Sequence, residues 1–336
     1  MTRRFLLATL MLAIFIPCAA QATESSHRFD KRLTGYTYPF PVKSFEVSTQ
    51  GQTLTMAYMY LAPKGDMPVV TLLHGKNFNG AYFDAIATTL HKAGYGVLMP
   101  DQIGFGKSAK PVNYQYSFAA LASHTRELMS SLNIERSIIL GHSMGGMLAS
   151  RFALLYPGVT TQLILVNPIG LENYLQYVQY KDVDFFYQKE LNKTPESIVS
   201  YQREHYYDGD WNDSYEALTV PLQGWVRGDD WEVLAKVSAL TYDMIFTQPV
   251  IDEFDDFTMP VTLIIGTRDT TGPGRNWKKE GVDYTLGEYD KLGNRVKARN
   301  REIDVKPLPG LGHLPFIEDY SQFKPVLLDV LGEKRD

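Results

Sequence analysis

The residues Ile138-Ile-Leu-Gly141-His142-Ser143-Met144-Gly145-Gly146 connect a short apolar run to a stretch in which Leu148, Phe152 and Leu155 recur at helical spacing. This pattern predicts a strand, a sharp turn centred on Ser143, and then a helix. A serine on such a turn has strained backbone angles, so small residues two positions before and after it are needed to avoid clashes. The Gly-x-Ser-x-Gly spacing meets that requirement.

The predicted turn gives Ser143 the position of a nucleophile. Its hydroxyl would project from the edge of a sheet. The backbone amide of Met144, at the start of the helix, would point to the place where an oxyanion forms. A glycine-rich packing turn without chemistry is the alternative interpretation, and the strand and helix on either side of the turn favour the nucleophile.

A nucleophilic serine needs a base, and for this kind of turn the expected chain order is serine, acid, histidine. Of the seven histidines, only His205 and His313 follow Ser143. His205 lies in an aromatic segment without a strand to hold it. His313 lies in a Gly- and Pro-containing loop after the last expected strand, and such a loop can return an imidazole to the sheet edge. We therefore expect His313 to be the base.

The acid that orients the base is expected at Asp269, in a loop that directly follows the apolar run at residues 261–265. The other common position, after the preceding strand, holds Asn167, which cannot supply a negative charge. A turn aspartate that binds its own backbone is the alternative for Asp269, and Asp304 is the best substitute for it.

Patterns typical of strands and helices alternate along most of the chain, which predicts an α/β fold with a mostly parallel sheet and helices on both faces. The strands are expected at residues 42–47, 54–61, 67–73, 96–100, 137–140, 163–166, 261–265 and 303–307, and the helices at 79–93, 117–132, 144–156 and 321–331. Between residues 171 and 246 the strand pattern stops and aromatic residues become frequent. We expect a helical cap at residues 170–250 between two parts of one core, residues 23–169 and 251–336.

Five motifs occur in order along the chain: Leu73-His74-Gly75, the loop Asp101-Gln-Ile-Gly104-Phe-Gly106-Lys-Ser108, Gly141-His-Ser143-Met-Gly145-Gly146, Asp269, and Gly312-His313-x-Pro315. With them, residues 42–331 resemble the α/β-hydrolase superfamily, in its form with one sheet and a helical cap. The resemblance implies that a second oxyanion amide comes from Lys76. Many relatives have an apolar or aromatic residue there, and the charged side chain is expected to favour anionic or polar substrates. The long interval between Asp269 and His313 predicts an extra surface excursion at residues 275–299.

The loop Asp101–Ser108 ends like a phosphate-binding loop, because Gly106, Lys107 and Ser108 occur in that order. A phosphate-binding loop requires a glycine five residues before Gly106. That position holds Asp101, so a structural turn below the active site is the better interpretation.

The composition is that of an ordinary globular protein, with 336 residues, 44% hydrophobic, and a formal net charge of −5. This excludes a disordered or collagen-like chain and argues against a nucleic-acid partner. Cys18 is the only cysteine. A mature chain without it would have no disulfide, thiol nucleophile or cysteine-ligated zinc, and the mechanism needs no cofactor or metal.

Residues 1–22 have the features of a secretory signal peptide: Arg3 and Arg4, the uncharged run Phe5–Ile16, and a small-x-small site that ends at Ala22. Twelve apolar residues extend only about 18 Å as a helix, too short for a hydrocarbon core of roughly 30 Å, so a membrane span is disfavoured. A lipoprotein is disfavoured because Pro17 precedes Cys18. We expect a periplasmic or secreted protein without a stable membrane span in the mature chain.

The expected function is hydrolysis of a carboxylic ester through an acyl-enzyme, with a small to medium, partly apolar small-molecule ester as substrate. Three alternatives use the same residues: a carbon–carbon bond hydrolase of the meta-cleavage type, an amidase, and an acyltransferase. Dehalogenases and epoxide hydrolases of this superfamily use an aspartate nucleophile, which Ser143 disfavours. A binding protein on the same scaffold is the alternative that is not an enzyme. The aromatic residues of the cap either line the pocket or pack against one another.

Overall fold

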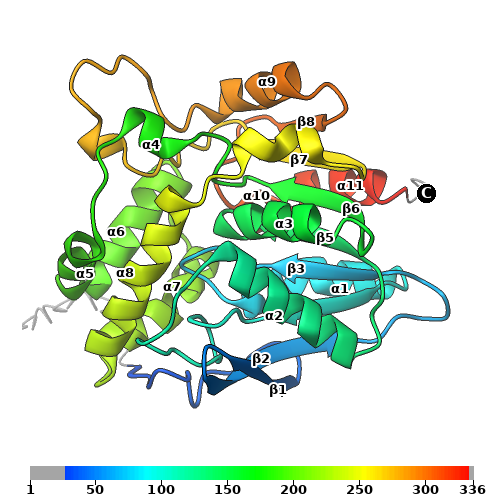
Figure 1. Ribbon diagram of the computed structural model, residues 1–336, viewed down its shortest axis with the longest axis horizontal. Helices are drawn as coiled ribbons and strands as arrows, with labels where there is room; N and C mark the ends of the chain where they lie inside the picture. Colours follow the sequence, from blue (N-terminus) through cyan, green and yellow to red (C-terminus); the bar gives the residue numbers. More distant parts are fainter. Residues whose placement is uncertain (1–26, 333–336) are drawn as a thin grey trace, which may run out of the picture.

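The computed structural model describes residues 27–332. Its strands form one sheet in the order β1-β2-β4-β3-β5-β6-β7-β8 (Figure 1). The pairs β1–β2 and β2–β4 are antiparallel and all other neighbours are parallel, which confirms the mostly parallel sheet. The strands are β1 (Val42–Thr49), β2 (Gln52–Leu61), β3 (Val69–Leu73), β4 (Gly96–Pro100), β5 (Ser137–His142), β6 (Thr160–Val166), β7 (Val261–Gly266) and β8 (Asp304–Leu308). The predicted signal peptide lies outside the described residues.

Helices cover both faces of the sheet, as expected (Figure 1). One face packs against α2, α3 and α9, and the other against α1 and α11. The bounds of the core helices are α1 (Asp84–Lys92), α2 (Phe118–Ser131), α3 (Met144–Leu155), α9 (Tyr289–Arg299), α10 (Pro315–Glu318) and α11 (Tyr320–Val330), and three 3₁₀ turns are η1 (Gly80–Phe83), η2 (Ile251–Asp256) and η3 (Arg275–Trp277).

The central strands are apolar at nearly every position because both of their faces are buried. In β5, Ile138 and Leu140 belong to the hydrophobic cluster on the α1 side, whereas Ile139 belongs to the cluster on the α3 side. Strand side chains point alternately to the two faces, so one continuous apolar run supplies two separate cores. This arrangement fixes the register of the strands that carry the functional loops.

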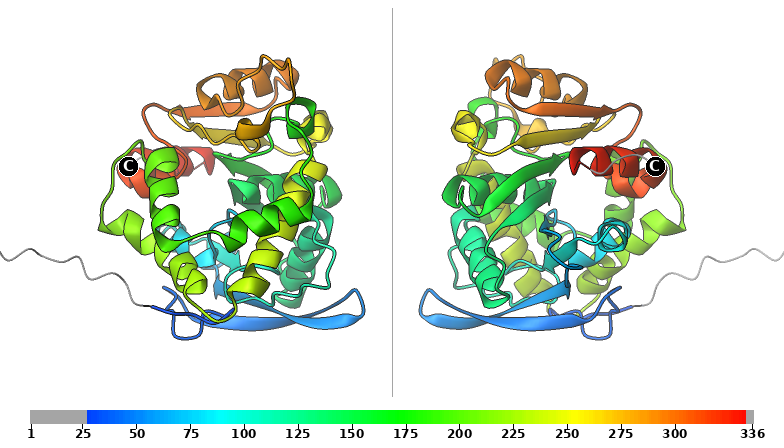
Figure 2. Two further views of the ribbon diagram at one scale, coloured as in Figure 1. Left: turned by 90° about the vertical axis from the view of Figure 1, so that its left-hand side faces the viewer. Right: turned by 90° about the vertical axis from the view of Figure 1, so that its right-hand side faces the viewer.

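Five helices lie between β6 and β7 and form the cap, which stands at one end of the sheet (Figures 1 and 2). Several of them start at a side chain that accepts backbone hydrogen bonds, such as Asp182, Thr194 and Asn212. Their bounds are α4 (Tyr174–Tyr177), α5 (Val183–Leu191), α6 (Pro195–Tyr206), α7 (Asp213–Val226) and α8 (Trp231–Thr247). Within residues 27–332, none of the helices is both long enough and apolar enough to cross a lipid bilayer.

The segment 275–299 differs from the surface excursion that we expected. Its second half is α9, whose Leu292 and Val296 are buried in the core on the α3 side of the sheet. Since β7 and β8 are parallel, a crossover must connect them, and α9 is that crossover. The first half lies against the cap, where the rings of Tyr177 and Tyr284 stack with their centroids 3.9 Å apart.

The loop after β4 is a structural turn. The carboxylate of Asp101 accepts hydrogen bonds from the backbone amides of Gly80 and Lys107, at 2.8 and 2.6 Å, and from the hydroxyl of Tyr38, at 2.7 Å. The ammonium of Lys107 donates to the carbonyl oxygen of Leu33. The residues that looked like a phosphate-binding loop therefore hold the amino-terminal segment and η1 in place.

The turn between β5 and α3 has no room for a side chain at Gly145. A Cβ atom there would lie 2.6 Å from the carbonyl carbon of Leu73 in β3, whereas a Cβ on Gly158, beyond the other end of α3, would have no neighbour within 4 Å. We expect Gly145→Ala to lower the free energy of unfolding by at least about 2 kcal/mol, because α3 must move away from β3. Gly158→Ala should change it by less than about 0.5 kcal/mol. Urea titration of both variants measures the difference, and equal stability would contradict this packing.

Candidate active site

Ser143 occupies the strained turn that the sequence predicts between β5 and α3. Its backbone has φ 57° and ψ −123°, in a region that residues other than glycine rarely adopt. The carbonyl oxygen of Ser143 accepts hydrogen bonds from the amides of Gly146 and Ile169. These contacts hold the turn in its strained conformation and present the hydroxyl at the carboxyl end of the strand.

The structure brings the three expected side chains together from three loops. Nε2 of His313 lies 2.9 Å from Oγ of Ser143, and Nδ1 of His313 lies 2.7 Å from Oδ2 of Asp269. The residues are 7%, 1% and 2% exposed for Ser143, His313 and Asp269, so the contacts are shielded from water. Such an arrangement can move a proton from the hydroxyl to the imidazole while the carboxylate stabilises the charge that forms.

Within residues 27–332, neither competing candidate forms a hydrogen bond with Ser143 or His313, although His205 lines the same cavity as Ser143. His205 belongs to α6 of the cap and contacts the ring of Tyr201. Asp304 begins β8 and forms an exposed ion pair with Lys306 at 3.1 Å. Because Asp304 is at the amino end of its strand, it is separated by the length of that strand from the edge at which Ser143 lies.

Asp269 is ionised in spite of its burial. Burial alone would raise its pKa, but the charge of His313 and hydrogen bonds from His313 and Thr271 outweigh that effect and lower the pKa below its ordinary value. The backbone amide of Thr271 donates to Oδ1 at 2.8 Å. Oγ1 of Thr271 also lies 3.1 Å from Nδ1 of His313.

Asn167 holds the carboxylate from the other side, a role that the sequence analysis missed. Its Nδ2 donates to Oδ2 of Asp269 at 2.9 Å, and its Oδ1 accepts from the amide of Gly266 at 2.9 Å. Its position just after β6 is the other common place for the acid. Its neutral amide instead positions the acid that follows the next strand.

His142, the residue before the serine, belongs to a buried hydrogen-bonded chain. The amide of Gly75 donates to the hydroxyl of Tyr82 at 2.9 Å, and that hydroxyl lies 2.8 Å from Nδ1 of His142. Nε2 of His142 then donates to the carbonyl oxygen of His313 at 2.8 Å. Burial, with a smaller effect from the charge of His313, lowers the pKa of His142 to about 3, so this ring is neutral and acts as a spacer between the loops.

Lys76 follows β3 directly, where the resemblance predicts an oxyanion amide, but its side chain does not behave as we expected. Its ammonium donates to the carbonyl and hydroxyl oxygens of Ser238 at 2.8 and 3.0 Å and to the hydroxyl of Thr241 at 2.8 Å. These contacts use all three protons of the ammonium form, so the side chain links the loop to α8. Burial lowers the pKa of Lys76 to about 7.

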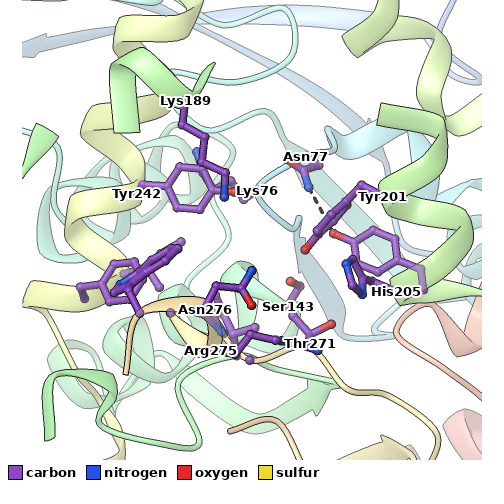
Figure 3. Close-up of a pocket in the computed structure, with 18 residues that line it drawn as sticks. Lys76, Asn77, Ser143, Lys189, Tyr201, His205, Tyr242, Thr271, Arg275 and Asn276 are labelled. Carbon is purple, nitrogen blue, oxygen red and sulfur yellow. Dashed lines mark hydrogen bonds between the residues drawn. The ribbon is translucent and has the colours of Figure 1, made fainter. Parts of the chain in front are cut away.

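A cavity of about 160 Å³ lies above Ser143, between the sheet and the cap (Figure 3). Aromatic side chains form much of its wall: Tyr201, Tyr206, Tyr242, Phe246 and Trp277. The ring of Tyr206 stacks on that of His313, with centroids 4.7 Å apart, and the rings of Phe186 and Tyr242 stack at 5.1 Å. The cap aromatics therefore line the cavity and also pack against one another. Within residues 27–332, no group of three or more His, Cys, Asp or Glu side chains is arranged to hold a metal ion.

The chain is similar to a "probable hydrolytic enzyme" from Pseudomonas aeruginosa PAO1, whose crystal structure has been determined. The two are 41% identical, with a TM-score of 0.88, over 91% of this chain and 98% of that one. An esterase from Thermogutta terrifontis has a TM-score of 0.65 at 17% identity, over 86% of this chain and 98% of the other. That second likeness shows the fold alone.

Curated relatives match a smaller part of the chain. A fluoroacetate dehalogenase from Burkholderia is 31% identical over 158 residues, which is 43% of this chain and 50% of that protein. The matches extend over about a third to a half of the length of such relatives. The family model for the alpha/beta hydrolase fold matches residues 68–279, more than half of the sequence. The chain therefore belongs to the alpha/beta hydrolase fold family.

Proposed function

We propose that this hydrolase cleaves a carboxylic ester by way of an acyl-enzyme. The observation that carries the proposal is the buried line of contacts from Oγ of Ser143 through His313 to Asp269, with distances of 2.9 and 2.7 Å. The cavity above Ser143 gives room for a partly apolar substrate. The predicted signal peptide makes export to the periplasm or the medium part of the same proposal.

In this mechanism, Ser143 attacks the ester carbonyl while His313 accepts the hydroxyl proton. Asp269 keeps the imidazole in the required tautomer and stabilises its charged form. The amides of Met144 and Lys76 stabilise the oxyanion, each by about 3 kcal/mol. His313 then donates its proton to the leaving alcohol. Finally, His313 activates a water molecule that releases the acid and regenerates Ser143.

The same three residues could also support amide cleavage, carbon–carbon bond hydrolysis or acyl transfer, and the choice of substrate distinguishes these reactions. Amides, vinylogous diketones and a second acyl acceptor should be tested beside esters. The name of the Burkholderia relative suggests dehalogenation. The serine at position 143 disfavours it, because the family's dehalogenases use an aspartate nucleophile.

The proposal predicts that Ser143→Ala removes both hydrolysis and covalent labelling. The substitution deletes the attacking oxygen, so kcat should fall by about 10⁶. A fluorophosphonate probe and a series of p-nitrophenyl esters graded by chain length measure the two effects. A folded wild-type protein that neither reacts with the probe nor turns over any ester would instead support the binding-protein alternative.

A second prediction concerns Asn167. In Asn167→Asp, a second carboxylate would stand beside Asp269, and two close carboxylates raise the pKa of one of them. The added negative charge would also stabilise the imidazolium of His313 and raise the pKa of that ring. We expect the acidic limb of the kcat/KM profile to move to higher pH, whereas Asn167→Ala should lower activity without that displacement. An unchanged profile in Asn167→Asp would contradict this role.

A third prediction follows from the buried Lys76. Its pKa is lowered from 10.5 to about 7, so the unfolded chain binds a proton that the folded protein lacks between these two values. The wild type should therefore gain stability relative to Lys76→Met as the pH rises from 7 to 10. Urea unfolding of both proteins at pH 7 and pH 9.5 gives the two differences. If the difference in free energy of unfolding between the two proteins stays constant, or shifts against the wild type at pH 9.5, the pKa of Lys76 is not lowered in the folded protein.

A further inference from the structure

The cavity above Ser143 receives two cationic side chains that take no part in the proposed mechanism. Lys189 reaches it from α5 in the cap, and Arg275 reaches it from η3, in the loop that follows β7 (Figure 3). The two side chains come from segments that are far apart in the sequence. Lys76 also lines the cavity, but its side chain is hydrogen-bonded to Ser238 and Thr241 of α8 and burial lowers its pKa to about 7, so Lys189 and Arg275 are the cations available to a bound molecule.

Arg275 faces the cavity from the side of Ser143. It is four residues after Thr271, which contacts His313. Its positive charge acts across the cavity on α6: burial and then Arg275 lower the pKa of His205, and Arg275 opposes the rise that burial causes in the pKa of Tyr201. Within residues 27–332, the guanidinium of Arg275 makes no ion pair or hydrogen bond with the protein.

Lys189, on the opposite wall of the cavity, likewise has no ion pair within the described residues. Its ammonium lies 5.5 Å from the ring centre of Trp277, and no carboxylate of the described chain forms an ion pair with it. The adjacent Glu190 is engaged by Lys193 at 2.7 Å. Burial, followed by repulsion from Lys193, lowers the pKa of Lys189. An anion in the cavity would offset both effects.

The charge of the cavity is opposite to that of the whole protein. The chain has a formal net charge of −5. Among the eighteen described residues that line the cavity, however, there is no Asp or Glu. The nearest functional carboxylate, Asp269, is buried behind His313 and Thr271. A cavity walled by aromatic rings and cations attracts an anion with a flat apolar body.

We propose that the substrate of the Ser143 site is an ester that also bears a carboxylate, bound in the cavity by Arg275 and Lys189. This inference rests on the proposed ester hydrolysis and names its substrate class. The guanidinium offers a planar pair of donors that matches a carboxylate, and the ammonium adds a second positive charge. The aromatic walls bind the apolar part of the molecule.

The experiment compares two esters of the same shape, 4-acetoxybenzoate and 4-acetoxybenzamide, which differ in the charge of one group. The wild type should prefer the carboxylate by about 10-fold in kcat/KM, mainly through KM, because hydrogen bonds to charged groups are the stronger ones. Arg275→Gln and Lys189→Met should each remove most of this preference, measured within each variant as the ratio of kcat/KM for the two esters. High salt should also reduce the preference.

Lys278→Met is the matched control, because it removes one positive charge from the same loop. Lys278 is exposed, donates to the carbonyl oxygen of Tyr284 and does not line the cavity above Ser143. The Lys278→Met variant should keep the preference of the wild type for 4-acetoxybenzoate. Equal or faster turnover of the neutral ester by the wild type would overturn the proposal. An equal loss of preference in Lys278→Met and Arg275→Gln would also overturn it, because the effect would then come from net charge alone.

Binding to Ser143→Ala separates this proposal from the catalytic one. Calorimetry should show 4-acetoxybenzoate binding about 10-fold more tightly than 4-acetoxybenzamide, with the difference lost when Arg275→Gln is added. Preferential binding without turnover by the wild type would support the anion site and contradict ester hydrolysis. Turnover of both esters with no difference in binding would contradict the anion site and leave ester hydrolysis intact.

Discussion

The close approach of α3 to β3 is the constraint on which the site depends. Gly145 lies directly against the backbone of Leu73, so the helix starts immediately above the strand end. Ser143 must then turn the chain within one residue, and it does so with a positive φ of 57°. The strain is tolerated because the buried apolar strands on both sides fix the ends of the turn. The same packing sets the positions of the hydroxyl and of the amide of Met144.

Polar contacts then align the neighbouring loops with that turn. Asn167 and Thr271 hold Asp269 from two sides, and His142 connects the loop of Tyr82 to the backbone of His313. All of these groups except the half-buried Thr271 are buried, and each has its hydrogen-bonding partners, so moving one loop would leave a polar atom unpaired in a low-dielectric interior. The network gives the loops the rigidity that a preorganised site requires.

The cap contributes to the site and does not merely cover it. Tyr206 of α6 stacks on His313, and Lys76 ties the loop after β3 to α8. Lys189 and Arg275 add positive charge to a cavity that is lined largely by aromatic side chains and, within the described residues, by no carboxylate. The sheet therefore supplies the reacting groups, while the cap and the loop after β7 supply the surroundings that would select a substrate.

The sequence alone determined the strands, the helices α1, α2, α3 and α11, and the turn at Ser143, because period-two and helical apolar patterns and the small residues of a tight turn are local properties. It also indicated His313 and Asp269, since parallel strands end at one edge of a sheet. The direction of the Lys76 side chain, the roles of Asn167 and Tyr206, and the crossover helix within residues 275–299 were decided by the tertiary structure. Each of them depends on a partner far away in the sequence, such as Ser238 for Lys76 or Asp269 for Asn167. A local pattern carries no information about which distant atom will complete a buried hydrogen bond, and only the folded chain brings the two together.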